Sequence, residues 1–222
     1  MESPDNSDIS PQEARNISPE RLTMLTDAVV AIIMTILVLD LEIPGASGGK
    51  PLSEGLLDLL PIFTTFVISF LLVGMYWVWH RGFFAQVRYA DYRLAWLNLL
   101  FLLPLSLIPF AASTLGSHPD DPTALQLYGA ILVAVTLMRS MLNWYLHRHP
   151  WMLWQVPSAK ARRLSATAAA SPLVVYLLAI LIAEPAPVLS TLLYLAVPLI
   201  YAGVILFLKK DSRTSSAAQD IS

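Results

Sequence analysis

Six long apolar segments dominate this chain and leave it few ways to fold. A transmembrane helix needs about 20 apolar residues to cross the hydrocarbon core of a bilayer. Segments of this kind occupy 19–41, 52–79, 92–115, 124–146, 164–182 and 188–208. Inside hydrocarbon all backbone polar groups must be paired within the protein, and a helix achieves this segment by segment. We therefore expect an all-α, polytopic membrane protein with six transmembrane helices per subunit.

The two ends of the chain differ from this apolar middle. Residues 1–17 and 210–222 are polar and are expected to be disordered tails, with the six-helix transmembrane domain at 18–209. Ser18 is expected to cap the first helix, with Pro19 at its first position, where the missing N–H is harmless.

The composition excludes several classes of function. Only 14% of the residues are charged, whereas soluble proteins have about 25%. The net charge of -2 argues against a nucleic-acid partner. The chain has no cysteine, which excludes disulfides and thiolate metal sites. It also lacks H-E-x-x-H, a nucleophile elbow, a phosphate loop and a dinucleotide fingerprint, so we expect neither an enzyme nor a cofactor.

The basic residues predict how the chain is oriented in the membrane. All but two lie at the ends of the chain or in the loops after the second and fourth spans, while the opposite loops hold only Lys50. Cytoplasmic loops are enriched in Lys and Arg. We therefore expect a multi-pass membrane protein with both termini in the cytoplasm.

One face of the first helix combines apolar, hydroxyl and acidic side chains. Spacings of three and four place on this face Leu25, Ala28, Ile32, Thr35, Leu39 and Glu42. If several copies met around an axis, Ile32 and Leu39 would form apolar constrictions with Thr35 as the polar ring between them. Glu42, with Asp40 beside it, would form a negative outer mouth that attracts cations. The alternative is that this row is only the buried packing face of the helix, with the Thr35 hydroxyl bonded to its own backbone.

Arg21 and Asp27 are ionisable residues near the inner end of the first helix. Such groups near hydrocarbon usually face the protein interior or a water path. We expect Asp27 to pair with Arg21 or with a residue from another helix, the candidates being His80, Arg139, Asn98 and Trp77. Functional coupling and plain structural pairing both remain open for Asp27. Arg139, inside the fourth span, is expected to form a structural ion pair.

Histidines offer a second possible chemistry. His80 could bind a metal or carry protons, but a lone histidine beside Trp77 and Trp79 is more often a hydrogen-bonded interfacial residue. His147 and His149 lie in a basic loop and are expected to have no specific role.

These residues resemble the signatures of the transmembrane protein 175 family, the lysosomal-type potassium channels. The family's first signature is Arg, three residues, then Phe-Ser-Asp and an Ala-Ile…Thr run. The chain matches it with Arg21, Leu25-Thr26-Asp27, Ala31-Ile32 and Thr35. The second signature is matched by Trp77, His80, Phe84, Asp91, Asn98 and Pro109. Leu25-Thr26 in place of Phe-Ser is a departure that keeps the hydroxyl but loses the aromatic ring.

The resemblance implies a cation channel with a modest preference for potassium, lined by the first helix. One repeat per chain implies a homotetramer in the lipid bilayer. By position, Ile32 matches the family's hydrophobic constriction, Thr35 the hydroxyl associated with selectivity and transient K⁺ contact, and Leu39 the next apolar layer. The network that holds the inner helix ends would comprise Arg21, Thr26, Asp27, Trp77, His80 and Asn98.

Two hypotheses follow from the sequence. The first is a potassium-preferring channel without a carbonyl filter, because the chain lacks T-V-G-Y-G. The second is a proton channel or a proton-coupled transporter that uses Asp27 and His80 as a relay.

Overall fold

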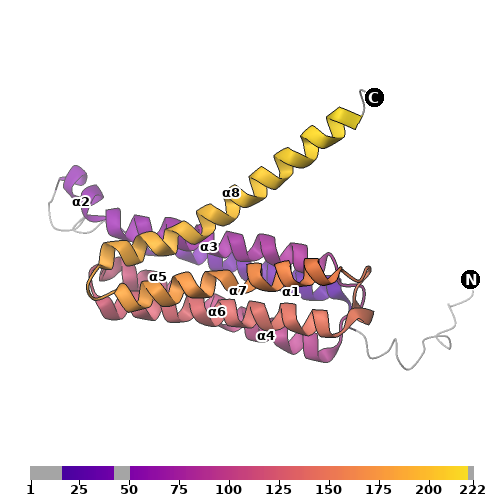
Figure 1. Ribbon diagram of the computed structural model, residues 1–222. Helices are drawn as coiled ribbons and strands as arrows, with labels where there is room; N and C mark the ends of the chain where they lie inside the picture. The colour runs from indigo at the N-terminus through magenta and orange to yellow at the C-terminus, as the bar shows by residue number, and fades with distance from the viewer. Residues whose placement is uncertain (1–16, 43–50, 220–222) are drawn as a thin grey trace, which may run out of the picture.

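The chain folds into a bundle of long helices that run side by side (Figure 1). The computed structural model describes residues 17–42 and 51–219, and from residue 204 onward it describes only the backbone. The described elements are α1 (Pro19–Ile36), the 3-10 turn η3 (Leu37–Asp40), α2 (Leu52–Asp58), α3 (Leu60–Phe84), α4 (Tyr92–Ser106), α5 (Ile108–Ser117), α6 (Pro122–Arg148), the 3-10 turn η4 (Pro150–Met152), α7 (Ala159–Ile182) and α8 (Pro187–Gln219). The all-α, polytopic fold expected from the sequence is confirmed.

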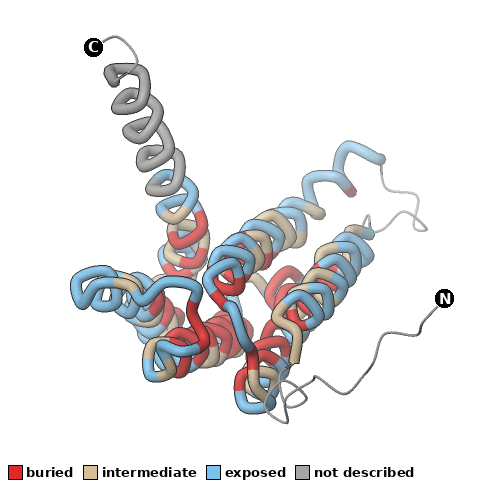
Figure 2. The backbone as a smooth tube through the Cα atoms, turned by 90° about the vertical axis from the view of Figure 1, so that its right-hand side faces the viewer, coloured by how far each residue is buried: buried red, intermediate tan, exposed pale blue. Residues whose placement is uncertain are grey.

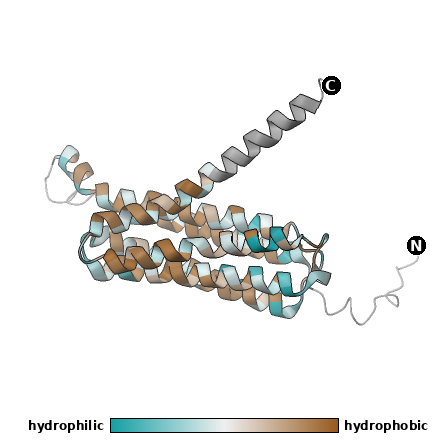
Figure 3. Ribbon diagram, in the orientation of Figure 1, coloured by the Kyte–Doolittle hydropathy of each residue, from teal (hydrophilic) through white to brown (hydrophobic). Residues whose placement is uncertain are grey.

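Five helical segments are long and apolar enough to cross a membrane. They are Pro19–Asp40, Leu60–Phe84, Tyr92–Ser117, Pro122–Arg148 and Ala159–Ile182. The sixth expected span lies in α8, whose side chains are described only as far as Gly203. Figure 3 shows hydrophobic residues along the body of the bundle and hydrophilic ones concentrated where α6 ends and α7 begins.

Two expected spans are interrupted, each at a proline. The span expected at 52–79 is broken at Leu59, because Pro61 cannot donate a backbone hydrogen bond to continue α2 into α3. The expected third span changes from α4 to α5 at Leu107, between Pro104 and Pro109. The kink expected from these two prolines is therefore present.

Capping residues set several other helix ends. Ser18 and Pro19 begin α1 as expected, although the Ser18 hydroxyl makes no capping bond to the backbone. Asp91 begins α4, and Asp121 begins α6 by accepting a hydrogen bond from the Thr123 N–H at 2.7 Å. These backbone hydrogen bonds lower the pKa of the Asp121 carboxyl.

The C-terminal helix is longer than expected. The tail expected at 210–222 overlaps the last turns of α8, which ends at Gln219. A polar composition is a weak argument against helix here, since an existing helix gains one hydrogen bond for each residue added. Residues 1–16, most of the expected N-terminal tail, and the Gly-rich connection at 45–49 lie outside the described residues.

The core fills the centre of the bundle, where α3 packs against α1 and α5, and α6 packs against α4 and α7. In Figure 2 the buried residues face the interior of the bundle and the exposed ones face outward. The largest buried side chains of the core include Tyr76, Tyr128, Tyr176 and Phe101. The tyrosine hydroxyls are paired, for example Tyr128 with Ser69 at 2.8 Å and Tyr76 with Thr136 at 3.1 Å. Paired hydroxyls lower the cost of placing tyrosine in a dry interior.

Gly129 allows α6 to approach α7 and α8 closely. A Cβ atom at this position would lie 2.3 Å from the Tyr194 hydroxyl and 2.5 Å from the Ile180 Cγ1 atom. We expect Gly129→Ala to reduce the free energy of unfolding by about 1–3 kcal/mol, the usual cost of overpacking. Thermal unfolding in detergent measures this loss. Gly74→Ala is the matched control, because its Cβ would meet no atom within 4 Å and should cause no loss.

Candidate functional site

Helix α1 has one packed face and one exposed face within the subunit. The packed face consists of Leu22, Thr26, Val30 and Ile33, continued by Leu37 in η3. The exposed residues include the whole row predicted from the sequence, namely Leu25, Ala28, Ile32, Thr35, Leu39 and Glu42. The division follows the helical period, since residues three and four apart share a face.

The alternative interpretation of this row was burial inside the subunit, and the subunit does not show it. Ile32 is 57% exposed and Leu39 is 70% exposed. The Thr35 hydroxyl does bond to its own backbone, donating to the Ile32 carbonyl at 2.8 Å. That bond uses the only proton of the hydroxyl and leaves oxygen lone pairs available to a cation or to water.

The two carboxylates at the outer end of this segment have different surroundings. Asp40 is half-buried and accepts a hydrogen bond from the Ser113 hydroxyl of α5 at 3.2 Å. Glu42 is exposed. Asp40 therefore ties the end of η3 to α5, while Glu42 is the freer negative charge.

A buried polar triad joins α1, α3 and α4 near the inner end. The His80 Nε2 atom lies 2.9 Å from the Asn98 Oδ1 atom and 3.2 Å from the Thr26 Oγ1 atom. The Asn98 amide donates to the Thr26 hydroxyl at 3.1 Å, and all three residues are fully buried. The His80 Nδ1 atom has no hydrogen-bond partner in the described residues. This pattern fits the Nε2–H tautomer, in which the unpartnered Nδ1 is an acceptor and no N–H is left unpaired.

Aromatic rings enclose the triad. The His80 ring lies 4.5 Å from Phe84 and is stacked on Phe101 at 5.8 Å, measured between ring centroids. The hydrogen-bonded role expected for His80 is present, but the residue is inside the subunit and not at its surface. The hydrogen bonds of the triad hold the inner half of α1 against α3 and α4.

Asp27 pairs with Trp77, one of the four candidates from the sequence. The Trp77 indole N–H donates to the Asp27 carboxylate at 2.7 Å. Arg81, one turn further along α3, lies over the Trp77 ring at 5.3 Å from its centroid. The sequence interpretation missed Arg81, although its spacing of four from Trp77 indicated a shared face. Arg21 is exposed, and no hydrogen bond or ion pair in the described residues joins its guanidinium to this network.

Leu25-Thr26, which stands in place of the family's Phe-Ser, fits the packing of the subunit. The Thr26 hydroxyl is a member of the triad, so the hydroxyl retained at this position is used. Leu25 is 41% exposed and points away from the subunit core. The missing aromatic ring therefore leaves no void within the subunit.

The prediction that Arg139 forms an ion pair is wrong. Its guanidinium donates to the backbone carbonyls of Ala168 (2.7 Å) and Ala169 in α7, and no carboxylate in the described residues lies within salt-bridge distance. Pro172, four residues after Ala168, has no N–H to bond that carbonyl. The guanidinium also lies 5.3 Å from the centroid of the Trp79 ring. Arg139, together with the Ser171 hydroxyl at 3.3 Å, thus donates to the Ala168 carbonyl in place of the N–H that Pro172 lacks.

Removing the Thr26 hydroxyl tests the triad. We expect Thr26→Val to lower the free energy of unfolding by about 1–3 kcal/mol, because buried groups of His80 and Asn98 lose a partner. Thermal unfolding in detergent gives the value. Thr64→Val is the matched control, since that hydroxyl is exposed and bonds only to the Leu60 carbonyl of its own helix. Equal losses in the two variants would contradict a special role for the triad.

Similarity to known proteins identifies the family of this chain. The family model described as endosomal/lysosomal potassium channel TMEM175 matches residues 21–109, which include α1, the triad and Trp77. A protein of Streptomyces collinus that is named a potassium channel is 31% identical over 151 residues, covering 65% of this chain and 73% of that protein. This chain belongs to the TMEM175 family. It is therefore a multi-pass membrane protein of an ion-channel family.

Other TMEM175 relatives share smaller parts of their length with this chain. A Chryseobacterium protein also named a potassium channel is 38% identical over 52% of this chain and 59% of its own length. The zebrafish (Danio rerio) protein, named an endosomal/lysosomal proton channel, is 25% identical over 61% of this chain and 26% of its own length. Whole-protein activities of these relatives are therefore transferred to this chain only as proposals.

Solved TMEM175 structures share the fold. The crystal structure of a lysosomal potassium-selective channel TMEM175 homologue from Chamaesiphon minutus superposes with a TM-score of 0.71 at 24% identity, covering 83% of this chain and 96% of that one. A variant of the potassium channel MtTMEM175 in complex with a nanobody fusion protein gives a TM-score of 0.56 at 19% identity, covering 94% and 98%.

Proposed function

We propose that this TMEM175 protein is a homotetrameric, potassium-preferring cation channel whose pore is lined by the exposed row of α1. The observation that supports this most is the division of α1 into two faces. The packed face is held by α3 and by the triad, whereas the exposed row carries Ile32 and the Thr35 hydroxyl in α1, Leu39 in η3 and the Glu42 carboxylate beyond η3. Lipid would cover apolar side chains alone, but Thr35 and Glu42 on the same row favour a water-filled axis.

Each residue of the row then has a distinct role. Ile32 forms the narrowest ring, which controls passage by excluding water, and Leu39 forms a second apolar ring. Thr35 lies between them and offers oxygen lone pairs to a passing K⁺ ion. Glu42 raises the local cation concentration at the outer mouth, with Asp40 held closer to α5.

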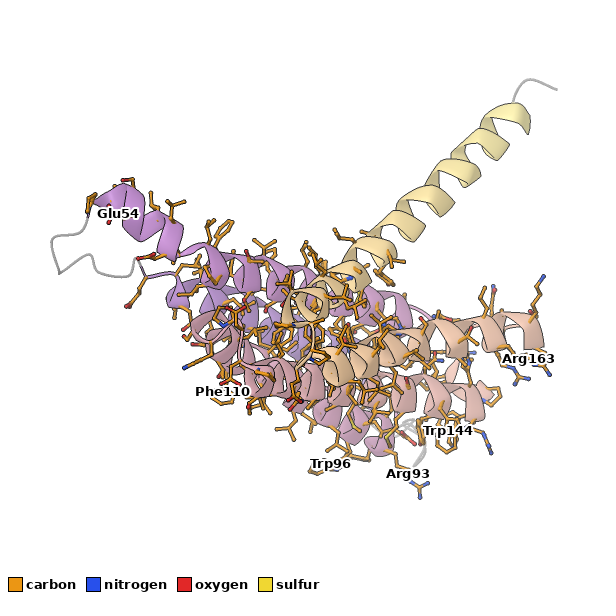
Figure 4. The ribbon with its side chains drawn as sticks, turned by 60° about the vertical axis from the view of Figure 1, so that its left-hand side comes forward. Glu54, Arg93, Trp96, Phe110, Trp144 and Arg163 are labelled. Carbon is orange, nitrogen blue, oxygen red and sulfur yellow. The ribbon has the colours of Figure 1, made fainter. Side chains whose placement is uncertain are left out.

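The proposed orientation places both termini in the cytoplasm of a bacterial cell, in the inner membrane. Arg93, Trp144 and Arg163 lie at one end of the bundle and Glu54 lies at the other (Figure 4). Basic and tryptophan side chains at one end match a cytoplasmic boundary. The partners of the chain are then its own copies and the bilayer, and we expect no nucleic acid, cofactor or catalytic activity.

Proton permeation is the alternative, and the names of the animal relatives favour it for those proteins. In the described residues, however, no hydrogen bond connects the two members of the expected relay. Asp27 is bonded to Trp77, and His80 to Thr26 and Asn98. A relay through Asp27 and His80 is therefore not supported by the geometry.

Flux measurements in liposomes test the proposed function directly. Protein reconstituted in liposomes should pass K⁺ faster than Na⁺ under an applied voltage without a pH gradient. Separate K⁺, Na⁺ and H⁺ readouts distinguish the alternatives. Uptake that depends on a pH gradient and disappears in Asp27→Asn would instead indicate a proton-coupled transporter.

Cysteine cross-linking tests whether the row faces an axis. Because the chain has no native cysteine, any disulfide in Leu39→Cys must join two subunits. A disulfide requires Cα atoms within about 7 Å, so we expect covalent dimers in oxidised membranes, seen by gel electrophoresis. Val174→Cys, on the exposed face of α7, should remain monomeric. Dimers in the control but not at position 39 would place α1 against lipid, and native mass spectrometry gives the subunit number.

A further inference from the structure

A basic cleft lies between the inner ends of α6 and α7, away from the α1 row. Its volume is about 350 Å³. Its charged and aromatic lining consists of Trp144, His147 and Arg148 from α6 and of Arg162 and Arg163 from α7. Figure 4 shows Trp144 and Arg163 at the same end of the bundle. None of these five residues takes part in the pore or in the network of α1.

The lining of this cleft is basic. It contains no Asp or Glu. The sequence has no acidic residue between Asp121 and Glu184, a stretch that includes all of α6 and α7. Arg162 and Arg163 also lie near the N-terminal end of α7, where backbone N–H groups add a partial positive charge. Four basic side chains therefore surround a space that can hold an anion.

Two further observations favour a ligand that carries several oxygen atoms and lies at the level of the lipid headgroups. Both ring nitrogens of His147 are shielded from solvent and have no hydrogen-bond partner in the described residues. Arg148 lies over the Trp144 ring at 5.1 Å from its centroid, which holds its guanidinium at the cleft. Trp144 itself is 57% exposed, as expected for a tryptophan at the level of lipid headgroups.

The geometry points to a binding site for the phosphate headgroup of an anionic phospholipid. Arginine binds phosphate oxygens through paired N–H donors, and three arginines line this cleft. Above the cleft, α6 and α7 present exposed apolar side chains that suit an acyl chain, such as Leu137, Met141 and Val174. A free phosphate would satisfy the arginines but not this apolar surface. Basic pockets between helices on the cytoplasmic side are the usual form of such lipid sites.

Native mass spectrometry of the full-length protein in detergent tests the site without any ion-flux measurement, so its result is independent of the proposed channel function. The probes are phosphatidylglycerol and phosphatidylcholine with the same acyl chains, each added at increasing concentration. We expect retention of phosphatidylglycerol but not phosphatidylcholine. Arg162→Gln with Arg163→Gln should weaken that binding about 30-fold, from about 1 kcal/mol for each cation near the headgroups.

Two controls test whether the loss of lipid binding is specific to the cleft. Arg93→Gln removes an exposed arginine at the same end of the bundle but outside the cleft, and it should retain wild-type affinity. Both arginines of the double variant are exposed, so unchanged thermal stability should accompany the loss. Equal binding by the double variant and wild type, or an equal loss in Arg93→Gln, would refute the site. Displacement of the lipid by millimolar inorganic phosphate would assign the cleft to a soluble phosphate instead.

Discussion

Replacing Ile32 with asparagine is expected to raise K⁺ flux several-fold and to bring the K⁺ to Na⁺ flux ratio toward one. An apolar constriction holds back ions because water does not fill it, and an amide on each subunit would let water in. Thr35 alone would then have to discriminate between partly hydrated ions. The measurement is K⁺ and Na⁺ flux in liposomes at equal protein density.

The control for this prediction is Val174→Asn, which places the same amide on a 71% exposed position of α7. It should leave both fluxes unchanged, because the α7 face is expected to contact lipid. Unaltered flux in Ile32→Asn, or equal K⁺ and Na⁺ flux in the wild-type protein, would remove Ile32 from the pore.

Replacing Arg139 with methionine is expected to lower the free energy of unfolding by roughly 3–5 kcal/mol. The part-buried carbonyl of Ala168 and the buried carbonyl of Ala169 lose a donor, at about 1–3 kcal/mol each, and the contact of the guanidinium with the Trp79 ring is lost as well. Methionine fills much of the same volume, so the loss reports the missing hydrogen bonds more than a cavity. Thermal unfolding in detergent measures it.

A double-mutant cycle identifies the cause of this loss. Pro172→Ala restores the backbone N–H that can bond the Ala168 carbonyl within α7. In the Pro172→Ala background, Arg139→Met should therefore cost about 1–3 kcal/mol less than in the wild-type protein. If the two changes are additive, Arg139 stabilises the bundle through its ring contacts alone and not through the proline-freed carbonyl.

The approximate positions of the helices and the grouping of one row of side chains on α1 were predictable from local patterns. Apolar length predicted the spans, Pro104 and Pro109 predicted the break in the third one, and the 3.6-residue period placed Ile32, Thr35 and Leu39 together. The family signatures pointed to Thr26, Trp77, His80 and Asn98 as one network. The break at Leu59 could also have been predicted, because Pro61 follows it by two residues. The continuous apolar run was instead interpreted as one span.

The contacts between helices could not be predicted in the same way. Asp27 had five possible partners, and Arg139 was assigned a carboxylate it does not have. Arg139 reaches the carbonyls of Ala168 and Ala169 only because α6 and α7 pack side by side, and no pattern within either helix indicates that contact. Periodicity likewise groups residues on a face without saying whether that face is packed or exposed.

The sequence by itself therefore determined the membrane class, the approximate positions of the helices and the set of side chains on each helix face. These depend on hydropathy and on hydrogen bonds within single segments. Only the tertiary structure decided that the Ile32 face is exposed, that Thr26, His80 and Asn98 form a closed triad and that Arg139 serves the α7 backbone. Those outcomes depend on which helices lie next to each other, and that is settled by the packing of the whole bundle.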